Sequence, residues 1–280
     1  MTESQIAEEK PAPKRRKKSF FDWVIEIICF GILAYFVINE FSHIYRTPSS
    51  FQSAETTYSR HYNLSTTFPF VGSYFLMVPE DYDTRYKYPL VVALHGISDR
   101  VYAAEYLAED KFRTRFKAFV LVPIAPKRAF WETPEDETFS LPQFIPYPDH
   151  MPNVMSMINS LKDDYNIDER KIYLTGHSMG GQGVFGALQN YPVTFAAAQA
   201  LSGTWSPQET GNILTPLWII HGSNDTQIPP KYSRQVAATL KQRGADAQYS
   251  ELQNTGHDSW RAIYPNQSSW EWLFAHTKQP

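Results

Sequence analysis

The chain has 280 residues, of which 42% are hydrophobic and 15% aromatic, and this suits one large globular domain with an additional segment. Its net charge of −3 argues against a nucleic-acid-binding surface, so no nucleic-acid partner is expected. The single cysteine, Cys29, cannot form a disulfide within the chain, so the cysteine content does not report the cellular compartment.

An apolar segment near the start of the chain is long enough to be a membrane anchor. Residues 1–19 are mostly polar and end in a basic cluster, and residues 20–39 are predominantly apolar, with Asp22 and Glu26 near their start. A membrane-spanning helix needs about 20 such residues. Because basic flanks stay in the cytoplasm, we expect a cytoplasmic tail over 1–19 and a single transmembrane helix over 20–39. The rest of the chain is then expected outside the cytoplasm, held at the cell membrane.

Three other interpretations of this segment are open. A cleaved signal peptide is disfavoured because no A-x-A-like site follows the apolar residues. An amphipathic helix lying in the membrane interface, or a core helix beside a nuclear-type basic patch, would fit the same composition.

The remaining chain divides into a polar connection and a domain. Residues 40–69 are rich in Ser, Thr, Tyr and His with little periodicity, and predict a stalk, followed by a catalytic domain over 70–280. Strands alternate with helices along that domain, which predicts an α/β fold: a mostly parallel sheet with helices on both faces. The predicted strands are 73–78, 90–94, 118–123, 172–175, 195–201, 217–220 and 247–252, and the predicted helices are 101–109, 153–164, the residues after 180, 230–243 and 268–276.

The sequence KIYLTGHSMGGQGVFGALQNY contains the motif on which the functional prediction depends. A predicted strand is followed by G-x-S-x-G around Ser178 and then by a predicted helix, the arrangement of a nucleophile elbow. Gly176 and Gly180 leave room for the sharp turn that exposes the Ser178 hydroxyl. The alternative is a glycine-rich helix start with an ordinary N-cap serine.

Two further residues follow later strand ends, in the order that this arrangement requires. A serine hydroxyl needs a positioned base, usually a histidine oriented by a carboxylate. Asp225 lies just after the predicted strand 217–220, and His257 lies just after 247–252. The carboxyl ends of parallel strands meet at one edge of the sheet, so we predict a catalytic triad of Ser178, Asp225 and His257.

Each member of the triad also has a simpler interpretation. Asp225 could be a turn residue before the Ile-Pro-Pro sequence, and His257 a loop histidine satisfied by the backbone. Asp258 is a rival acid, but it adjoins the base and is badly placed to orient it. We predict that His221 is structural, because its strand end already supplies Asp225.

The negative charge that develops on an attacked carbonyl needs hydrogen-bond donors. The amide of Met179 is one candidate, since it follows the nucleophile. The second is expected in the loop after strand 90–94, where Gly96 permits close approach and Ile97 offers its amide. His95 is expected to shape this loop.

Aromatic residues are frequent near the predicted site. Residues 127–152 form an irregular segment rich in aromatic side chains and prolines, typical of a functional loop. Trp131, Trp205 and Trp260 each follow a predicted strand end and are candidates for the acyl or alcohol pocket. Packing in the core is the alternative for each.

Four pieces of the chain, LVVALHG, GHSMGG, HGSNDTQIPP and GHDSW, carry a family resemblance. From about residue 73 to its end, the chain resembles the α/β-hydrolase superfamily. Within it, the chain is similar to secreted esterases of the polyhydroxyalkanoate-depolymerase and feruloyl-esterase type and to the related "predicted peptidase" group. The resemblance implies Ser178 as nucleophile, Asp225 as acid and His257 as base, with oxyanion donors after His95 and at Met179. It implies no metal and no cofactor.

The expected function is therefore that of a membrane-anchored serine esterase acting on a small-molecule or polymeric ester. The ester would be cleaved through an acyl-enzyme on Ser178. A serine peptidase of the same fold is the first alternative, since amide and ester cleavage share this machinery. The second is a non-catalytic binding protein on a hydrolase scaffold.

Overall fold

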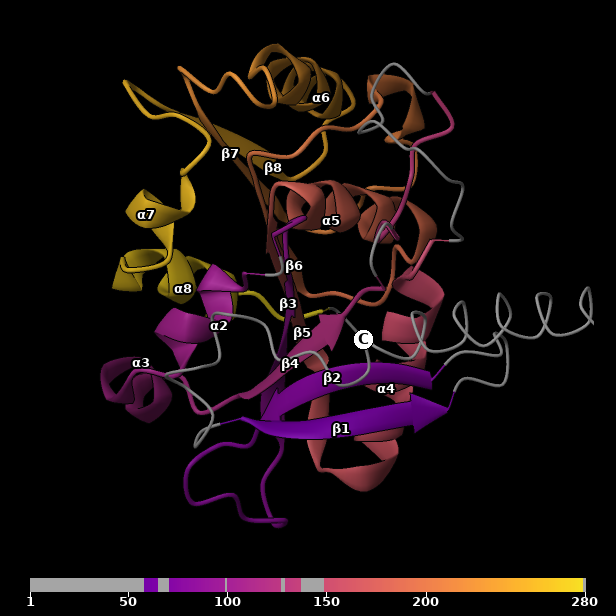
Figure 1. The fold of residues 1–280 in the computed structure, drawn as a ribbon, viewed down its shortest axis with the longest axis vertical. Coiled ribbons are helices and arrows are strands. Elements are labelled where there is room, and N and C mark those ends of the chain that lie inside the picture. Colours follow the sequence, from indigo (N-terminus) through magenta and orange to yellow (C-terminus); the bar gives the residue numbers. More distant parts are fainter. Residues whose placement is uncertain (1–57, 65–70, 99, 127–128, 137–148, 279–280) are drawn as a thin grey trace, which may run out of the picture. The chain divides into compact units, whose positions relative to one another are not determined.

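The computed structural model describes residues 58–64, 71–98, 100–126, 129–136 and 149–278 (Figure 1). The predicted cytoplasmic tail and transmembrane helix, residues 1–39, lie outside these ranges. Within the described ranges, no helix is both long enough and apolar enough to cross a membrane.

An eight-stranded sheet forms the centre of the described domain. Its spatial order is β1-β2-β4-β3-β5-β6-β7-β8. β2 runs antiparallel to both of its neighbours and the other pairs are parallel, which confirms the mostly parallel sheet. The strands are β1 (Ser59–Leu64), β2 (Val71–Met77), β3 (Tyr88–Leu94), β4 (Phe119–Ile124), β5 (Ile167–His177), β6 (Ala197–Leu201), β7 (Leu217–Gly222) and β8 (Ala247–Leu252).

Helices cover both faces of this sheet, as the alternating pattern predicts. Figure 1 shows α2, α3, α7 and α8 to the left of the central strands β3 and β6, and α4, α5 and α6 to their right. Successive residues of β3 alternate between the two layers: Leu90, Val92 and Leu94 pack with α4 and α5, whereas Val91 and Ala93 pack with α2 and α8. The helices are α2 (Tyr102–Leu107), α3 (Asp110–Arg115), α4 (Met151–Asp164), α5 (Met179–Asn190), α6 (Lys231–Gln242), α7 (Trp260–Ile263) and α8 (Gln267–Phe274), with a 3₁₀ turn η3 (Pro207–Glu209).

The first strand corrects the prediction of a stalk over residues 40–69. Within that range Ser59–Leu64 form β1, which pairs along its whole length with β2. The buried hydroxyl of Tyr58 also donates a hydrogen bond to the carbonyl of Ala104 in α2, at 3.0 Å. β1 is an edge strand with the sequence SRHYNL. Since such a strand pairs on one side only, it lacks the long apolar run of a central strand.

Three smaller differences concern element boundaries. The predicted helix over 101–109 corresponds to α2, which ends at Leu107, and a further short helix, α3, follows it from Asp110. β5 begins at Ile167, five residues before the predicted strand. The prediction missed this first part of the strand because it is polar. The short helix α7 was not apparent from the periodicity. Gly244 follows α6 with φ of 72°, as expected for a residue that ends a helix.

Candidate active site

Ser178 lies at a sharp turn between β5 and α5. Its backbone angles are φ 61° and ψ −120°, a strained conformation that costs on the order of 1–3 kcal/mol for a residue with a side chain. The turn requires glycine on both sides. A Cβ on Gly176 would lie 2.3 Å from the carbonyl oxygen of Gly180, and one on Gly180 would lie 2.4 Å from that of Leu94. The local sequence therefore explains how the serine is held at the end of the strand.

The structure brings Ser178, His257 and Asp225 into one hydrogen-bonded chain. The Oγ of Ser178 lies 2.9 Å from Nε2 of His257, and Nδ1 of His257 lies 2.7 Å from Oδ2 of Asp225. An ionised carboxylate only accepts, so Nδ1 carries the proton and Nε2 is free to accept from the serine hydroxyl. This is the arrangement of a nucleophile, a base and an orienting acid.

Asp225 is buried and its carboxylate is surrounded by donors. Oδ1 accepts from the amides of Gln227 and Ile228, each at 2.9 Å. Burial by itself would raise the pKa of Asp225, but its contacts with His221 and His257 and the Ile228 amide outweigh that effect. Together they hold the pKa of Asp225 well below its usual range, so the group is ionised at neutral pH.

The rival acid, Asp258, lies apart from this chain of hydrogen bonds. Its Oδ2 accepts from Nε of Arg261 at 3.0 Å, and half of its side chain is exposed. The structure therefore places Asp225, not Asp258, on the Nδ1 side of His257.

Two of the residues predicted to form the oxyanion hole, Met179 and Gly96, lie beside the nucleophile. Met179 is the first residue of α5, and the first amides of a helix have no carbonyl partner within the helix. A Cβ on Gly96 would lie 3.6 Å from Cβ of Ser178, so this loop passes directly against the serine.

The side chain of His95 orients the loop of Gly96 and Ile97. Its Nε2 accepts from the amide of Ala125 at 3.0 Å, so its Nδ1 carries the proton and donates to the carbonyl of Gly96 at 2.7 Å. The carbonyl of Gly96 and the amide of Ile97 belong to one trans peptide and point in opposite directions. Fixing the carbonyl toward the His95 ring therefore turns the Ile97 amide away from that ring.

A second histidine, His177, holds the backbone of the base and was not singled out by the sequence. Its Nε2 donates to the carbonyl oxygen of His257 at 2.5 Å. Burial, together with the neighbouring His257 ring, lowers the pKa of His177 to about 4, so this imidazole is neutral at pH 7. Tyr102 meets the His177 ring edge-on and stacks on Trp260, with the two ring centroids 3.7 Å apart.

The three tryptophans proposed as pocket walls are buried, which contradicts that prediction. The exposed fractions are 0% for Trp131, 1% for Trp205 and 7% for Trp260. The indole N–H of Trp131 donates to the carbonyl of His95 at 2.9 Å, and that of Trp205 to the carbonyl of Glu209 at 2.8 Å. Tryptophan is large and needs a partner for its N–H, and for Trp131 and Trp205 the core meets both needs.

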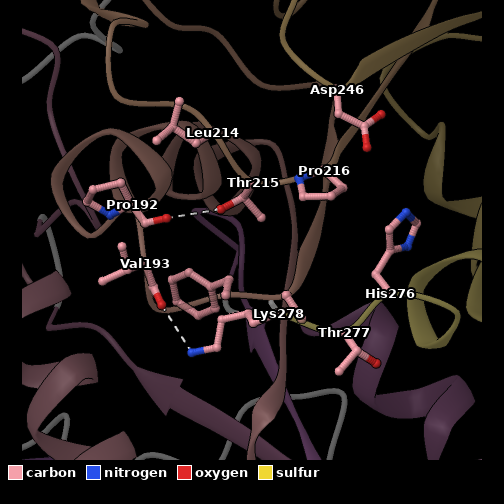
Figure 2. A pocket seen from close by; sticks show the side chains of 11 residues that line it. Pro192, Val193, Leu214, Thr215, Pro216, Asp246, His276, Thr277 and Lys278 are labelled. Carbon is pink, nitrogen blue, oxygen red and sulfur yellow. Dashed lines mark hydrogen bonds between the residues drawn. The ribbon is translucent and has the colours of Figure 1, made fainter. Parts of the chain in front are cut away.

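A hollow of about 560 Å³ lies at the amino ends of the strands, whereas the triad lies at their carboxyl ends (Figure 2). It is lined where β6, β7 and β8 begin, by residues such as Phe195, Pro216 and Asp246. Lys278 crosses one side and donates to the carbonyl of Val193 at 3.0 Å. No triad residue lines this hollow. In the part of the chain that the structure describes, no cluster of three or more His, Cys, Asp or Glu side chains is arranged to hold a metal ion.

Comparison with known proteins gives the family of the domain that carries this site. The Esterase family matches residues 73–272, most of the described domain. The chain belongs to the Esterase family. A solved thermostable esterase is 30% identical, with a TM-score of 0.71, over 80% of this chain and 64% of that one.

Two curated relatives are more distant. The chain is 23% identical to a Bacillus subtilis protein named as the uncharacterized peptidase YuxL, over 69% of this chain and 34% of that protein. It is also 23% identical to poly(3-hydroxyalkanoate) depolymerase C of Paucimonas lemoignei, over 69% of this chain and 42% of that one. This Esterase-family chain therefore spans less than half the length of either relative.

Proposed function

We propose that this protein is a membrane-anchored serine hydrolase that cleaves carboxylic esters through an acyl-enzyme on Ser178. The observation that carries the proposal is the continuous hydrogen-bonded chain from Ser178 through His257 to Asp225. The strained turn at Ser178 adds support, since such strain persists where the surrounding structure enforces it and is common at active sites.

In the first half of the reaction, Nε2 of His257 takes the proton of the Ser178 hydroxyl as Oγ attacks the ester carbonyl. Asp225 stabilises the imidazolium that forms and keeps the ring in the required orientation. The carbonyl oxygen becomes an oxyanion, which the amides of Met179 and Ile97 stabilise. Collapse of this intermediate breaks the bond to the alcohol, and His257 returns the proton to the leaving oxygen.

In the second half, water releases the acyl group. His257 takes a proton from the water, the resulting hydroxide attacks the acyl carbonyl, and the proton returns to Oγ of Ser178. The same oxyanion donors act again. None of these steps requires a redox change.

Two alternatives use the same scaffold. A serine peptidase would use the same triad, and the name of the Bacillus relative keeps it as the second candidate. A non-catalytic binding protein has no need for an aligned nucleophile, base and acid. Ester cleavage is preferred because the Esterase family matches the domain. The name of the Paucimonas relative makes polymeric esters candidate substrates beside small ones.

The anchor is the other part of this proposal. The apolar residues 20–39 and the basic residues before them support a single transmembrane helix with a cytoplasmic N-terminus. The hydrolase domain then acts outside the cytoplasm, where esters of the envelope or the surroundings reach it.

Ser178→Ala in the full-length protein tests the serine mechanism. We expect loss of covalent labelling by a fluorophosphonate and loss of p-nitrophenyl acetate hydrolysis, on the order of 10⁶ in kcat, because the nucleophile is gone. Folding should be retained, since the change removes only one hydroxyl. Assaying p-nitrophenyl esters beside aminoacyl p-nitroanilides separates the esterase from the peptidase. Retention of more than roughly a tenth of the wild-type rate would overturn the serine mechanism.

A further inference from the structure

A second imidazole, that of His221, lies on the carboxylate of Asp225. His221 is at the end of β7 and is fully buried. Its Nε2 lies 2.8 Å from the carbonyl oxygen of Ile228 and 3.2 Å from Oδ2 of Asp225. Its Nδ1 lies 2.7 Å from Oγ of Ser233 in α6. Oδ2 is the same oxygen that accepts from His257, so one carboxylate oxygen faces two histidines.

These partners determine which nitrogen of the His221 ring carries a proton. The carbonyl of Ile228 and the carboxylate of Asp225 can only accept, so Nε2 of His221 carries a hydrogen. On the other side, the hydroxyl of Ser233 can donate to Nδ1, or to the carbonyl of Gly203 at 3.2 Å. In both cases Nε2–H points at the acid.

The ring acts on both oxygens of Asp225. It approaches Oδ2 directly, and it also holds the carbonyl of Ile228, whose own amide donates to Oδ1 at 2.9 Å. Ser233 anchors the far side of the ring to α6. The acid loop is therefore tied through His221 to a helix and a strand, which are more rigid than a loop.

We propose that His221 is a positioning residue for the reaction, which holds Asp225 in line with Nδ1 of His257 and partly balances its charge. This inference rests on the proposed serine-hydrolase function. It departs from the sequence-based prediction that His221 is only structural. Among the described residues, the titratable groups that act on the ring are Asp225, His257, His177, and Glu251 opposite it on β8. Glu251 is already paired with Arg234 of α6.

Two variants separate positioning from packing. The amide nitrogen of glutamine reaches the place of Nε2, so His221→Gln keeps a donor for Asp225 and Ile228. The shorter asparagine reaches only the place of Nδ1, so His221→Asn keeps the contact with Ser233 and loses the donor to the acid. Both change a fully buried side chain, so both are expected to lower the melting temperature.

We expect the two variants to differ in kcat for p-nitrophenyl acetate. His221→Asn should lower kcat by roughly 10- to 100-fold with little change in KM, because a displaced acid no longer aligns the base. His221→Gln should stay within about fivefold of the wild type. The position and the charge of the Asp225 carboxylate both act on the protonated form of the base. The acid limb of the kcat/KM profile should therefore move in His221→Asn but not in His221→Gln.

The outcomes distinguish the possible failures. Equal kcat and an unshifted acid limb in both variants, with only the melting temperature lowered, would show a structural role and overturn the inference. If the wild-type protein itself shows no Ser178-dependent hydrolysis or labelling, the proposed function fails instead. Should His221→Asn not fold, Ser233→Ala takes its place, since it removes the hydroxyl that anchors Nδ1 and its contact with Gly203 but leaves the imidazole. A fall in kcat of roughly threefold to tenfold with unchanged KM supports the inference, and an unchanged kcat overturns it.

Discussion

At the scale of single residues, the first prediction separates the two neighbouring acids. Asp225→Asn should lower kcat by about 10⁴-fold, because the neutral amide neither stabilises the imidazolium nor fixes the tautomer of His257. Asp258→Asn should leave kcat within about twofold of the wild type, since its exposed carboxylate pairs with Arg261 and not with the base. Initial rates of p-nitrophenyl acetate hydrolysis provide the comparison, with circular dichroism as the check on folding. A larger loss in Asp258→Asn would reassign the acid.

A second prediction concerns the buried carboxyl of Glu132. Burial, with the nearby charge of Asp149, raises the pKa of Glu132 from 4.5 to about 7. Below the unfolded value the group is neutral in both states, and above about 7 it is ionised in both. Between these values the folded protein binds more protons, so stability must fall as the pH rises. The loss amounts to about 3 kcal/mol at most.

Glu132→Gln tests this pH dependence. Glutamine can still accept the hydrogen bond that Nδ2 of Asn190 gives to Glu132 at 2.9 Å, but it does not ionise. We expect the variant to lose much of the fall in melting temperature between about pH 5 and about pH 8, and to be the more stable protein at the upper end. The exposed Glu135→Gln is the matched control. A wild-type stability that does not change across this range would contradict the assigned pKa.

The residue identities of the triad could be predicted because they depend on chain order and strand ends. The contacts of the other histidines could not, because they depend on which way each ring turns. His177 adjoins the nucleophile in the sequence, yet it acts on the carbonyl of His257. The prediction that the tryptophans line a pocket was wrong for a related reason. A position after a strand end does not say whether the ring turns toward solvent or into the core, and Trp131 turns inward.

At the scale of elements, the loops that carry acid and base are packed backbone to backbone. A Cβ on Gly222, at the end of β7, would lie 2.1 Å from the carbonyl oxygen of Gly256 and 2.4 Å from that of Thr255. The amide of Asn224 also donates to the carbonyl of Thr255 at 2.9 Å. The position of His257 relative to Asp225 is therefore set by this close approach.

Gly222→Ala should separate the two loops. We expect kcat to fall by on the order of 10²-fold, because a shift of about 1 Å misplaces the base. Overpacking should lower the free energy of unfolding by about 1–3 kcal/mol. Gly211→Ala is the control, since the atom nearest to its Cβ would be in the guanidinium of Arg243, at 3.3 Å. Equal rates in the two variants would mean that the loops tolerate the added methyl group.

The element pattern was predictable where strands are buried on both faces and unpredictable at the edges of the sheet. The continuous apolar run of β3 indicates a central strand. β1 has no such run, and its strand conformation depends on its pairing with β2. The short helix α7 spans only four residues, Trp260–Ile263, which is too few for a periodicity to appear. Short and edge elements are thus defined by their tertiary partners.

At the scale of the whole molecule, two deletions test where the folded domain begins. Removing residues 1–45 should give a soluble protein with kcat within about twofold of the full-length enzyme, since every triad and oxyanion residue lies beyond that point. Removing residues 1–66 also deletes β1, which exposes the edge of β2 and the site vacated by Tyr58. We expect that protein to have a lower melting temperature and to aggregate. Equal melting temperatures would show that β1 does not stabilise the domain.

The last prediction concerns the proposed anchor. The basic cluster precedes residues 20–39, and the residues just after them lack one, so we expect the N-terminus inside and the hydrolase domain outside. Protease added to intact cells should digest the domain and leave the first 18 residues protected. The full-length protein should also stay in membranes washed with high salt, because a spanning helix is held by apolar contacts that salt does not weaken. Release by salt would indicate a surface-bound helix. Digestion of the domain only after permeabilisation would reverse the orientation.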